Sequence, residues 1–145
     1  MRVPADIHER VFGLTSDLLN IWEPDDTRAR WRLYGELSDY CESVAAAGRD
    51  HPFLWETLAD FTTDDRAAIG IYHRALLLTT TSGATEYEAS ICFALAERHS
   101  NLGETSVAYD YAIQANELAV HTDDLDLRKQ ISEFFLDHSG APSGT

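Results

Sequence analysis

The stretch LAERHSNLGETSVAYDYAIQA, residues 95–115, decides the fold, because small residues recur in it where two antiparallel helices need to approach closely. Ala96 follows Leu95 in the first half, Gly103 marks a tight turn, and the second half carries alanines at positions 108, 112 and 115. Alanines three and four positions apart lie on one face of a helix. The pattern therefore predicts a helical hairpin that packs through its small residues.

This spacing resembles a tetratricopeptide (TPR) repeat, in which a leucine with a compact neighbour, a turn glycine and an Ala-x3-aromatic/Ala-x2-Ala run follow one another. Only the aromatic position of the first helix differs, where this chain has His99. A displaced copy lies 40 residues earlier, where Ala68-x3-Tyr72-x2-Ala75 repeats the second-helix pattern and Trp55 stands in the place of Leu95. Two copies favour a repeat.

The resemblance is specific for residues 86–119 and weaker for residues 53–79. It implies that the first helix of each pair lines a groove that binds a peptide or a partner helix. Carried onto this chain, the groove positions of the two copies are Phe53, Thr57, Phe61, Ser90, Phe93, Glu97 and Asn101. These positions hold no Lys/Arg clamp for a terminal carboxylate, so an acidic peptide tail is not expected as the ligand.

Apolar residues recur at helical spacing along the chain and predict about seven helices. The expected helices cover approximately residues 4–23, 27–47, 52–61, 64–79, 86–102, 105–118 and 125–135. No run alternates with period two between hairpin turns, so no strand is expected. We predict an all-α fold of three helical hairpins plus a C-terminal capping helix, a TPR-like right-handed solenoid. One domain would span residues 1–138, followed by a flexible tail over residues 139–145.

Polar residues mark where these helices begin and end. The acids at positions 25–26, 64–65 and 123–124 suit helix N-termini, and Gly48 suits a helix C-terminus. The run Thr85-Glu86-Tyr87-Glu88 has the form of a capping box. The polar run over residues 79–84 predicts a loop before it.

The charge balance excludes some partners and favours others. The chain carries 25 acidic and 11 basic residues, a net charge of −14, so phosphate backbones should be repelled and nucleic acid is not an expected ligand. Between Ala75 and Asp126 the only Lys or Arg is Arg98, set against nine acids. We expect a basic protein or peptide to be steered to this region, with four of its acids taking part in binding: Glu86, Glu97, Asp110 and Glu117.

Motifs that carry chemistry are missing from the sequence. It contains no metal-ligand spacing, phosphate-binding glycine loop or nucleophile motif, so we predict no catalytic residue, no metal and no cofactor. Cys41 and Cys92 form no C-x2-C pattern and are expected to be reduced and buried. No stretch approaches the roughly 20 apolar residues of a membrane span, so we expect a cytoplasmic protein that does not contact membranes.

Two features have a structural and a functional interpretation. His99 occupies the aromatic position of the repeat and is predicted to pack between helices; the alternative is a ligand, because Cys92 lies two turns earlier on the same helix face. The basic cluster Arg28, Arg30 and Arg32 is expected to pair with neighbouring acids at positions 25, 26 and 36, and a docking patch is the alternative.

The three tryptophans Trp22, Trp31 and Trp55 are predicted to lie mostly in the core. Any one of them left exposed would be an interface anchor, since tryptophan is enriched among the residues that dominate binding energy.

These observations predict a non-enzymatic protein–protein interaction module, an acidic binder or inhibitor of a basic partner, such as an immunity or antitoxin-type protein that neutralises a toxin. An effector chaperone or a peptide-binding TPR adaptor is the alternative. A small-molecule sensor or enzyme would use a pocket around Tyr87, His99 and Tyr111. The chain is expected to be a monomer or a weak homodimer, and assembly with itself through an exposed hairpin is a further possibility.

Overall fold

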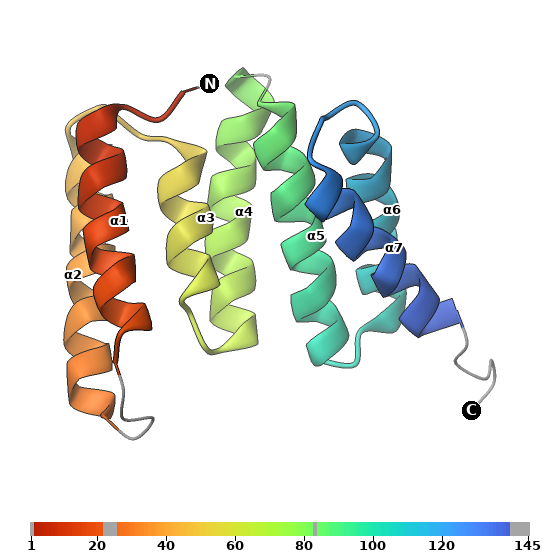
Figure 1. The fold of residues 1–145 in the computed structure, drawn as a ribbon, viewed down its shortest axis with the longest axis horizontal. Helices are drawn as coiled ribbons and strands as arrows, with labels where there is room; N and C mark the ends of the chain where they lie inside the picture. The colour runs from red at the N-terminus through yellow and green to blue at the C-terminus, as the bar shows by residue number, and fades with distance from the viewer. Residues whose placement is uncertain (1, 22–25, 83, 140–145) are drawn as a thin grey trace.

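The computed structural model describes residues 2–21, 26–82 and 84–139, and within these ranges it contains seven helices and no strand. Three helix pairs lie side by side along the long axis of the molecule, and the last helix packs against the third pair (Figure 1). This confirms the predicted all-α fold. The helices are α1 (Ala5–Leu19), α2 (Thr27–Ala46), α3 (Pro52–Asp60), α4 (Asp65–Ser82), α5 (Thr85–Asn101), α6 (Thr105–Ala119) and α7 (Leu125–Ser139).

Side-chain contacts order the helices into two rows. In one row, the Phe53 ring of α3 stacks on His8 of α1 at 5.9 Å between ring centroids, and α3 is hydrogen-bonded to α5. The other row is joined by ion pairs that α4 makes with α2 through Arg74 and with α6 through Arg66. Packing of neighbouring helices in this order is compatible with a helical repeat.

The core divides into two clusters of different composition. The first spans α1 to α5 and is filled by large side chains, among them Ile7, Leu14, Leu37, Leu54, Trp55 and Leu95. The second spans α5 to α7 and is rich in alanine: Ala89, Ala96, Ala108, Ala112, Ala115 and Ala119, with Ile131 and Phe134. Cys41 belongs to the first cluster and Cys92 to the second, and burial raises the pKa of both thiols to about 12.

The α5–α6 hairpin follows from the small residues that suggested it. Its alanines are completely or almost completely buried, so the two helices pack closely along their length. The turn rests on Gly103, whose φ of +76° lies in the left-handed region that favours glycine. The Gly103 and Glu104 N–H groups donate to the carbonyls of Ser100 and His99, which closes α5 with a Schellman motif.

Three of the predicted helix N-termini are confirmed by N-cap hydrogen bonds. A carboxylate oxygen of Asp26 accepts from the Ala29 N–H at 3.1 Å, and Asp64 and Asp124 cap α4 and α7 in the same way. Gly48 closes α2 with φ +78°. The first helix is shorter than expected, because α1 ends at Leu19 with Asn20 at its C-cap and does not reach residue 23. Residues 22–25 themselves and the tail from residue 140 onward lie outside the described residues.

Two expectations about helix ends are wrong. Residues 79–82 are the last turn of α4 and not a loop. The Thr79 and Thr80 hydroxyls donate to the carbonyls of Leu76 and Leu77, so these threonines bond within the helix they were expected to end. Thr85 is the first residue of α5, where Ala84 stands at the N-cap with no side-chain hydrogen bond, so the expected capping box does not form.

Candidate binding surface

The helix α3 connects its neighbours in the first row and carries three of the predicted groove residues. Phe53 and Thr57 are half-buried along it, and Phe61 stands at its C-cap. On the opposite side of the α3–α5 contact, the Ser90 hydroxyl donates to the Glu56 carboxylate at 2.5 Å. The structure therefore places the predicted residues of the two copies on adjoining helices, with Phe53 packed against His8 of α1 and Ser90 bonded to Glu56.

Phe93 does not belong to an open groove. Its side chain is only 6% exposed, because α7 covers it and the Phe134 ring meets it edge to face at 6.0 Å between centroids. A second contact fixes α7 in this place, since the Ser100 hydroxyl lies 2.9 Å from Nε2 of His138. Phe93 is therefore a core residue of the second cluster.

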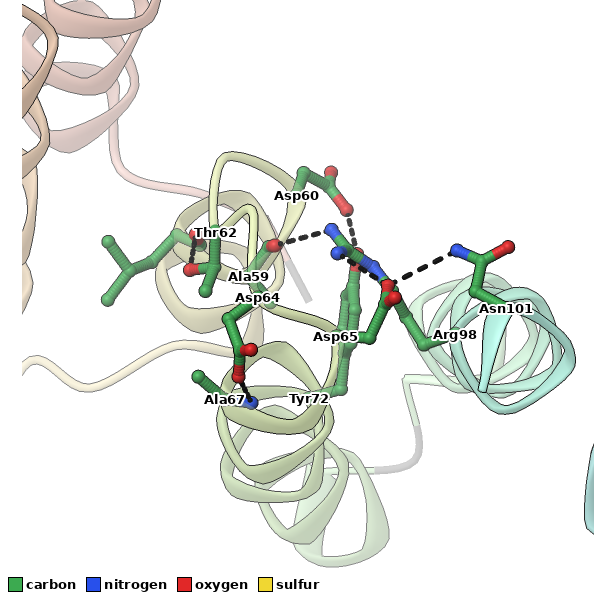
Figure 2. Close-up of polar contacts among 10 residues, drawn as sticks. Ala59, Asp60, Thr62, Asp64, Asp65, Ala67, Tyr72, Arg98 and Asn101 are labelled. Atoms are coloured by element: carbon green, nitrogen blue, oxygen red, sulfur yellow. Dashed lines mark hydrogen bonds and ion pairs between the residues drawn. The ribbon is translucent and has the colours of Figure 1, made fainter. Parts of the chain in front are cut away.

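Arg98 holds α5 against the α3–α4 turn. Its guanidinium donates to the Asp65 carboxylate at 3.2 Å and to the Ala59 carbonyl at 3.1 Å, and the side chain is only 16% exposed (Figure 2). Asn101 donates a second hydrogen bond to the same Asp65 oxygen, also at 3.2 Å. The only Lys or Arg between positions 75 and 126 thus points into the molecule.

The carboxylates around this contact are in different electrostatic environments. Loss of hydration between the helices raises the pKa of Glu56 to about 7, although the Ser90 hydrogen bond acts in the opposite direction. Desolvation likewise raises the pKa of Asp60, which accepts from the Tyr72 hydroxyl, and the pKa of Glu97. Asp65 differs, because hydrogen bonds from Asn101 and Arg98 lower its pKa. The α3–α5 contact therefore raises the pKa of three carboxylates, most strongly that of Glu56, and lowers the pKa of Asp65.

The four predicted acids occupy exposed positions of α5 and α6, and Glu97 among them also borders the α3–α5 contact, where desolvation raises its pKa. Glu86 and Glu97 on α5 are exposed, as are Asp110 and Glu117 on α6, and none of them forms an ion pair within the described residues. Asp110 and Glu117 are seven positions apart, so they share one side of α6. The ten predicted binding residues therefore do not form one continuous surface, because they are divided between α3 and α5 in one row and α6 in the other.

His99 is a packing residue in the structure. Its ring is 9% exposed and stacks on Tyr111 of α6 with 5.5 Å between centroids. Its Nδ1 lies 2.9 Å from an oxygen of Glu104, which also pairs with Arg66. Tyr87, twelve positions earlier on α5, makes its ring contact with His51. Among the described residues no three His, Cys, Asp or Glu side chains could hold a metal ion together.

His51 stands at the N-cap of α3, where the sequence predicted that this helix begins. Its Nδ1 accepts from the Phe53 N–H at 3.0 Å, while its buried Nε2 has no hydrogen-bond partner. The ring meets Tyr87 edge-on at 5.4 Å between centroids. Burial lowers the pKa of His51, which favours the neutral ring that this capping bond requires.

A cavity that sequence reasoning missed lies between the first two hairpins. It has a volume of about 550 Å³ and is enclosed by the last turn of α1, the first turns of α2 and the α3–α4 turn. Trp31 lines it and is 72% exposed, unlike Trp55, which is 2% exposed; Trp22 lies outside the described residues. The signal was present in the sequence, since Trp31 lies two positions from buried Leu33 and therefore on another side of α2.

The basic cluster Arg28, Arg30 and Arg32 borders this cavity, and only Arg30 lines it. Within the part of the chain that the structure describes, none of the three forms an ion pair, so the predicted bridges to Asp26 and Glu36 are wrong. The Asp26 carboxylate caps α2 instead. The third expected partner, Asp25, lies outside the described residues.

Comparisons with protein-family models, with curated proteins and with solved structures each gave no match for this chain. In the described ranges no helix is both long and apolar enough to cross a lipid bilayer.

Proposed function

We propose that this chain is a non-enzymatic, TPR-like interaction module of the cytoplasm that binds a basic protein partner through the acidic surface of α5 and α6. One observation carries the proposal. The only Lys or Arg between positions 75 and 126 is turned inward to Asp65 and the Ala59 carbonyl, while Glu86, Glu97, Asp110 and Glu117 are exposed and unpaired within the described residues. No cation on this hairpin offsets the negative field that a partner would meet.

Charge and apolar contact would serve different steps of this binding. Clustered exposed carboxylates raise the association rate of a cationic partner and add less to its final affinity. Affinity would come from aromatic side chains in the row that contains α5, where Phe12 on α1 is 65% exposed and Phe53 on α3 is half-buried. A partner that carries basic residues beside an apolar face fits both features.

Inhibition of a basic toxin, by covering its cationic active site, is one form that such binding would take. A chaperone for a basic effector would use the same surface, and the two differ only in what the partner does when released. Both forms require recognition of positive charge, which is the part that can be tested on the isolated protein.

The test uses a labelled lysine-rich amphipathic peptide as the partner, and its glutamate-substituted counterpart as the control probe. We expect fluorescence anisotropy to detect binding of the basic peptide alone, with affinity falling as salt rises from about 0.05 to about 0.5 M. Glu97→Lys and Glu117→Lys, made separately, should show whether the α5 side or the α6 side is used. Asp39→Lys on the exposed side of α2 makes the same charge change elsewhere.

Circular dichroism establishes that each variant is folded before its binding is compared. Peptide binding that is unchanged up to 0.5 M salt would contradict the proposal. Equal losses of peptide affinity in Asp39→Lys and in the two hairpin variants would also contradict the proposal. Such a result would mean that binding depends on net charge and not on a defined surface.

A further inference from the structure

The cavity between the first two hairpins has the size and the walls of a ligand site. Its volume of about 550 Å³ falls within the range of about 300–1,000 Å³ that small-molecule pockets occupy. Three aromatic side chains line it: Trp31 and Tyr34 from α2, whose rings stand at 89° to each other, and Phe61 from the C-cap of α3. Leu18 of α1 adds an aliphatic wall. A planar apolar group would find ring faces and edges here to pack against.

Two hydroxyl groups of the cavity wall, those of Tyr34 and Thr62, are already hydrogen-bonded. Thr62 donates from Oγ1 to the Leu58 carbonyl at 2.8 Å, so the Tyr34 hydroxyl, 2.7 Å away, donates to the same Oγ1. A ligand therefore gains nothing from displacing these bonds, and the aromatic part of the cavity behaves as an apolar surface.

Two charged side chains, Arg30 and Asp64, line the cavity wall, and only Asp64 is hydrogen-bonded within the described residues. Asp64 accepts from the Ala67 N–H at 2.8 Å at the start of α4, where the positive end of the helix offsets its charge. Asp26, just outside the wall, is committed in the same way at the start of α2. Arg30 lines the cavity and has no ion pair within the described residues. Within the described residues, Arg30 is therefore the charged group of the wall whose side chain has no hydrogen bond or ion pair inside the protein.

We propose that this cavity binds a small aromatic carboxylate, with its ring system among Trp31, Tyr34 and Phe61 and its carboxylate on the guanidinium of Arg30. A guanidinium pairs with a carboxylate through two parallel hydrogen bonds, which orients the anion as well as attracting it. A cationic ligand would be repelled by Arg30, and the lining carboxylate of Asp64 already accepts the Ala67 N–H at the start of α4. This site is separate from the acidic surface of α5 and α6, so either proposal can fail without the other.

The experiment compares two probes of nearly identical shape, 1-naphthylacetate and its neutral amide, by calorimetric titration of the full chain. We expect the carboxylate to bind about tenfold more tightly than the amide, as one charge-assisted contact provides. Arg30→Gln should lower the affinity of the carboxylate to that of the amide and leave the affinity of the amide unchanged. The indole N–H resonance of Trp31 should shift on titration with either probe.

Arg32→Gln is the matched control, because it removes the same charge two positions further along α2, where Arg32 is exposed and does not line the cavity. It should keep the preference for the carboxylate. The proposal is overturned if neither probe binds, if both bind equally well to the unaltered chain, or if Arg32→Gln loses the preference as fully as Arg30→Gln. Circular dichroism and a urea midpoint close to that of the unaltered chain qualify each variant for the comparison.

Discussion

The joint between α1–α2 and α3–α4, here the first joint, and the joint between α3–α4 and α5–α6, the second joint, are built from different contacts. The second joint is held by part-buried polar bonds, in which Arg98 grips Asp65 and Ala59 while Ser90 donates to Glu56. The first joint depends on a ring stack, one hydroxyl pair, the buried bond from the Cys41 thiol to the Leu54 carbonyl at 3.5 Å and the exposed ion pair of Arg74 with Glu42, and it leaves a cavity.

The two kinds of joint suit two different roles, a rigid support for a surface and a cavity for a ligand. A joint fixed by directional bonds keeps two hairpins in one relative position, so the acidic surface beyond it is displayed on a rigid support. A joint made of ring contacts around a cavity leaves apolar side chains accessible to a ligand. The binding proposals for the two ends of the molecule follow from how the hairpins meet as much as from which charges they carry.

Arg98→Leu is expected to have the largest effect on this comparison. It removes the clamp of the second joint and leaves the Ala59 carbonyl and the part-buried Asp65 without their cation, so the free energy of unfolding should fall by about 3 kcal/mol. Arg74→Leu in the first joint should lower it by only about 1 kcal/mol, because its pair with Glu42 is exposed and its main contact is the Trp55 ring face.

Urea unfolding monitored by circular dichroism measures both variants. If Arg74→Leu lowered the free energy of unfolding as much as Arg98→Leu, the two joints would depend equally on their arginines. That result would contradict the distinction between them.

The next effect concerns two adjacent alanines of α4. Ala68 is completely buried in the core, so Ala68→Leu overfills it and should lower the free energy of unfolding by about 2 kcal/mol. Ala67 is exposed and lines the cavity, so Ala67→Leu extends into open space and should change stability by less than about 0.5 kcal/mol. Thermal unfolding of the pair tests this, and similar losses at both positions would show that the first joint has no room.

The smallest effect is a pH dependence in the second joint. The pKa of Glu56 is raised from 4.5 to about 7 in the folded chain, so its contribution to stability is complete below pH 4.5 and is lost as pH rises through 7. Glu56→Gln keeps an acceptor for Ser90 and carries no charge. It should therefore stabilise the protein on the order of 1–2 kcal/mol at pH 8 and change little at pH 4.

Denaturant midpoints of the variant and the unaltered chain across this pH range measure the effect. Asp39→Asn, which neutralises an exposed acid of α2, should show no such dependence on pH. A Glu56→Gln advantage that grows toward acid pH would contradict the sign of the shift.

The existence and pairing of the helices could be predicted from the sequence, because apolar spacing, N-cap acids and turn glycines are local signals. Gly103 and Asp64 act as their residue types indicate. The last turn of α4 could not be predicted in this way, since Thr79 is buried and bonds within the helix, which composition alone does not reveal.

The candidate site was less predictable, because it depends on which helix covers which face. Phe93 occupies a groove position of the repeat, yet α7 covers it through Phe134, a contact between residues 41 positions apart in the chain. The cavity depends in the same way on the distance between α2 and the α3–α4 turn. Only the exposure of Trp31 could have been inferred locally, from its spacing relative to Leu33.

The two buried cysteines give the molecule an internal reporter of its own motions. With thiol pKa values of about 12, Cys41 and Cys92 carry almost no thiolate at neutral pH and are shielded from reagents while their clusters stay closed. Because one cysteine lies in each core cluster, the rate at which each becomes alkylated measures how often that half of the chain opens. Selective labelling of Cys41 before Cys92, or the reverse, would rank the two halves by local stability without any engineered probe.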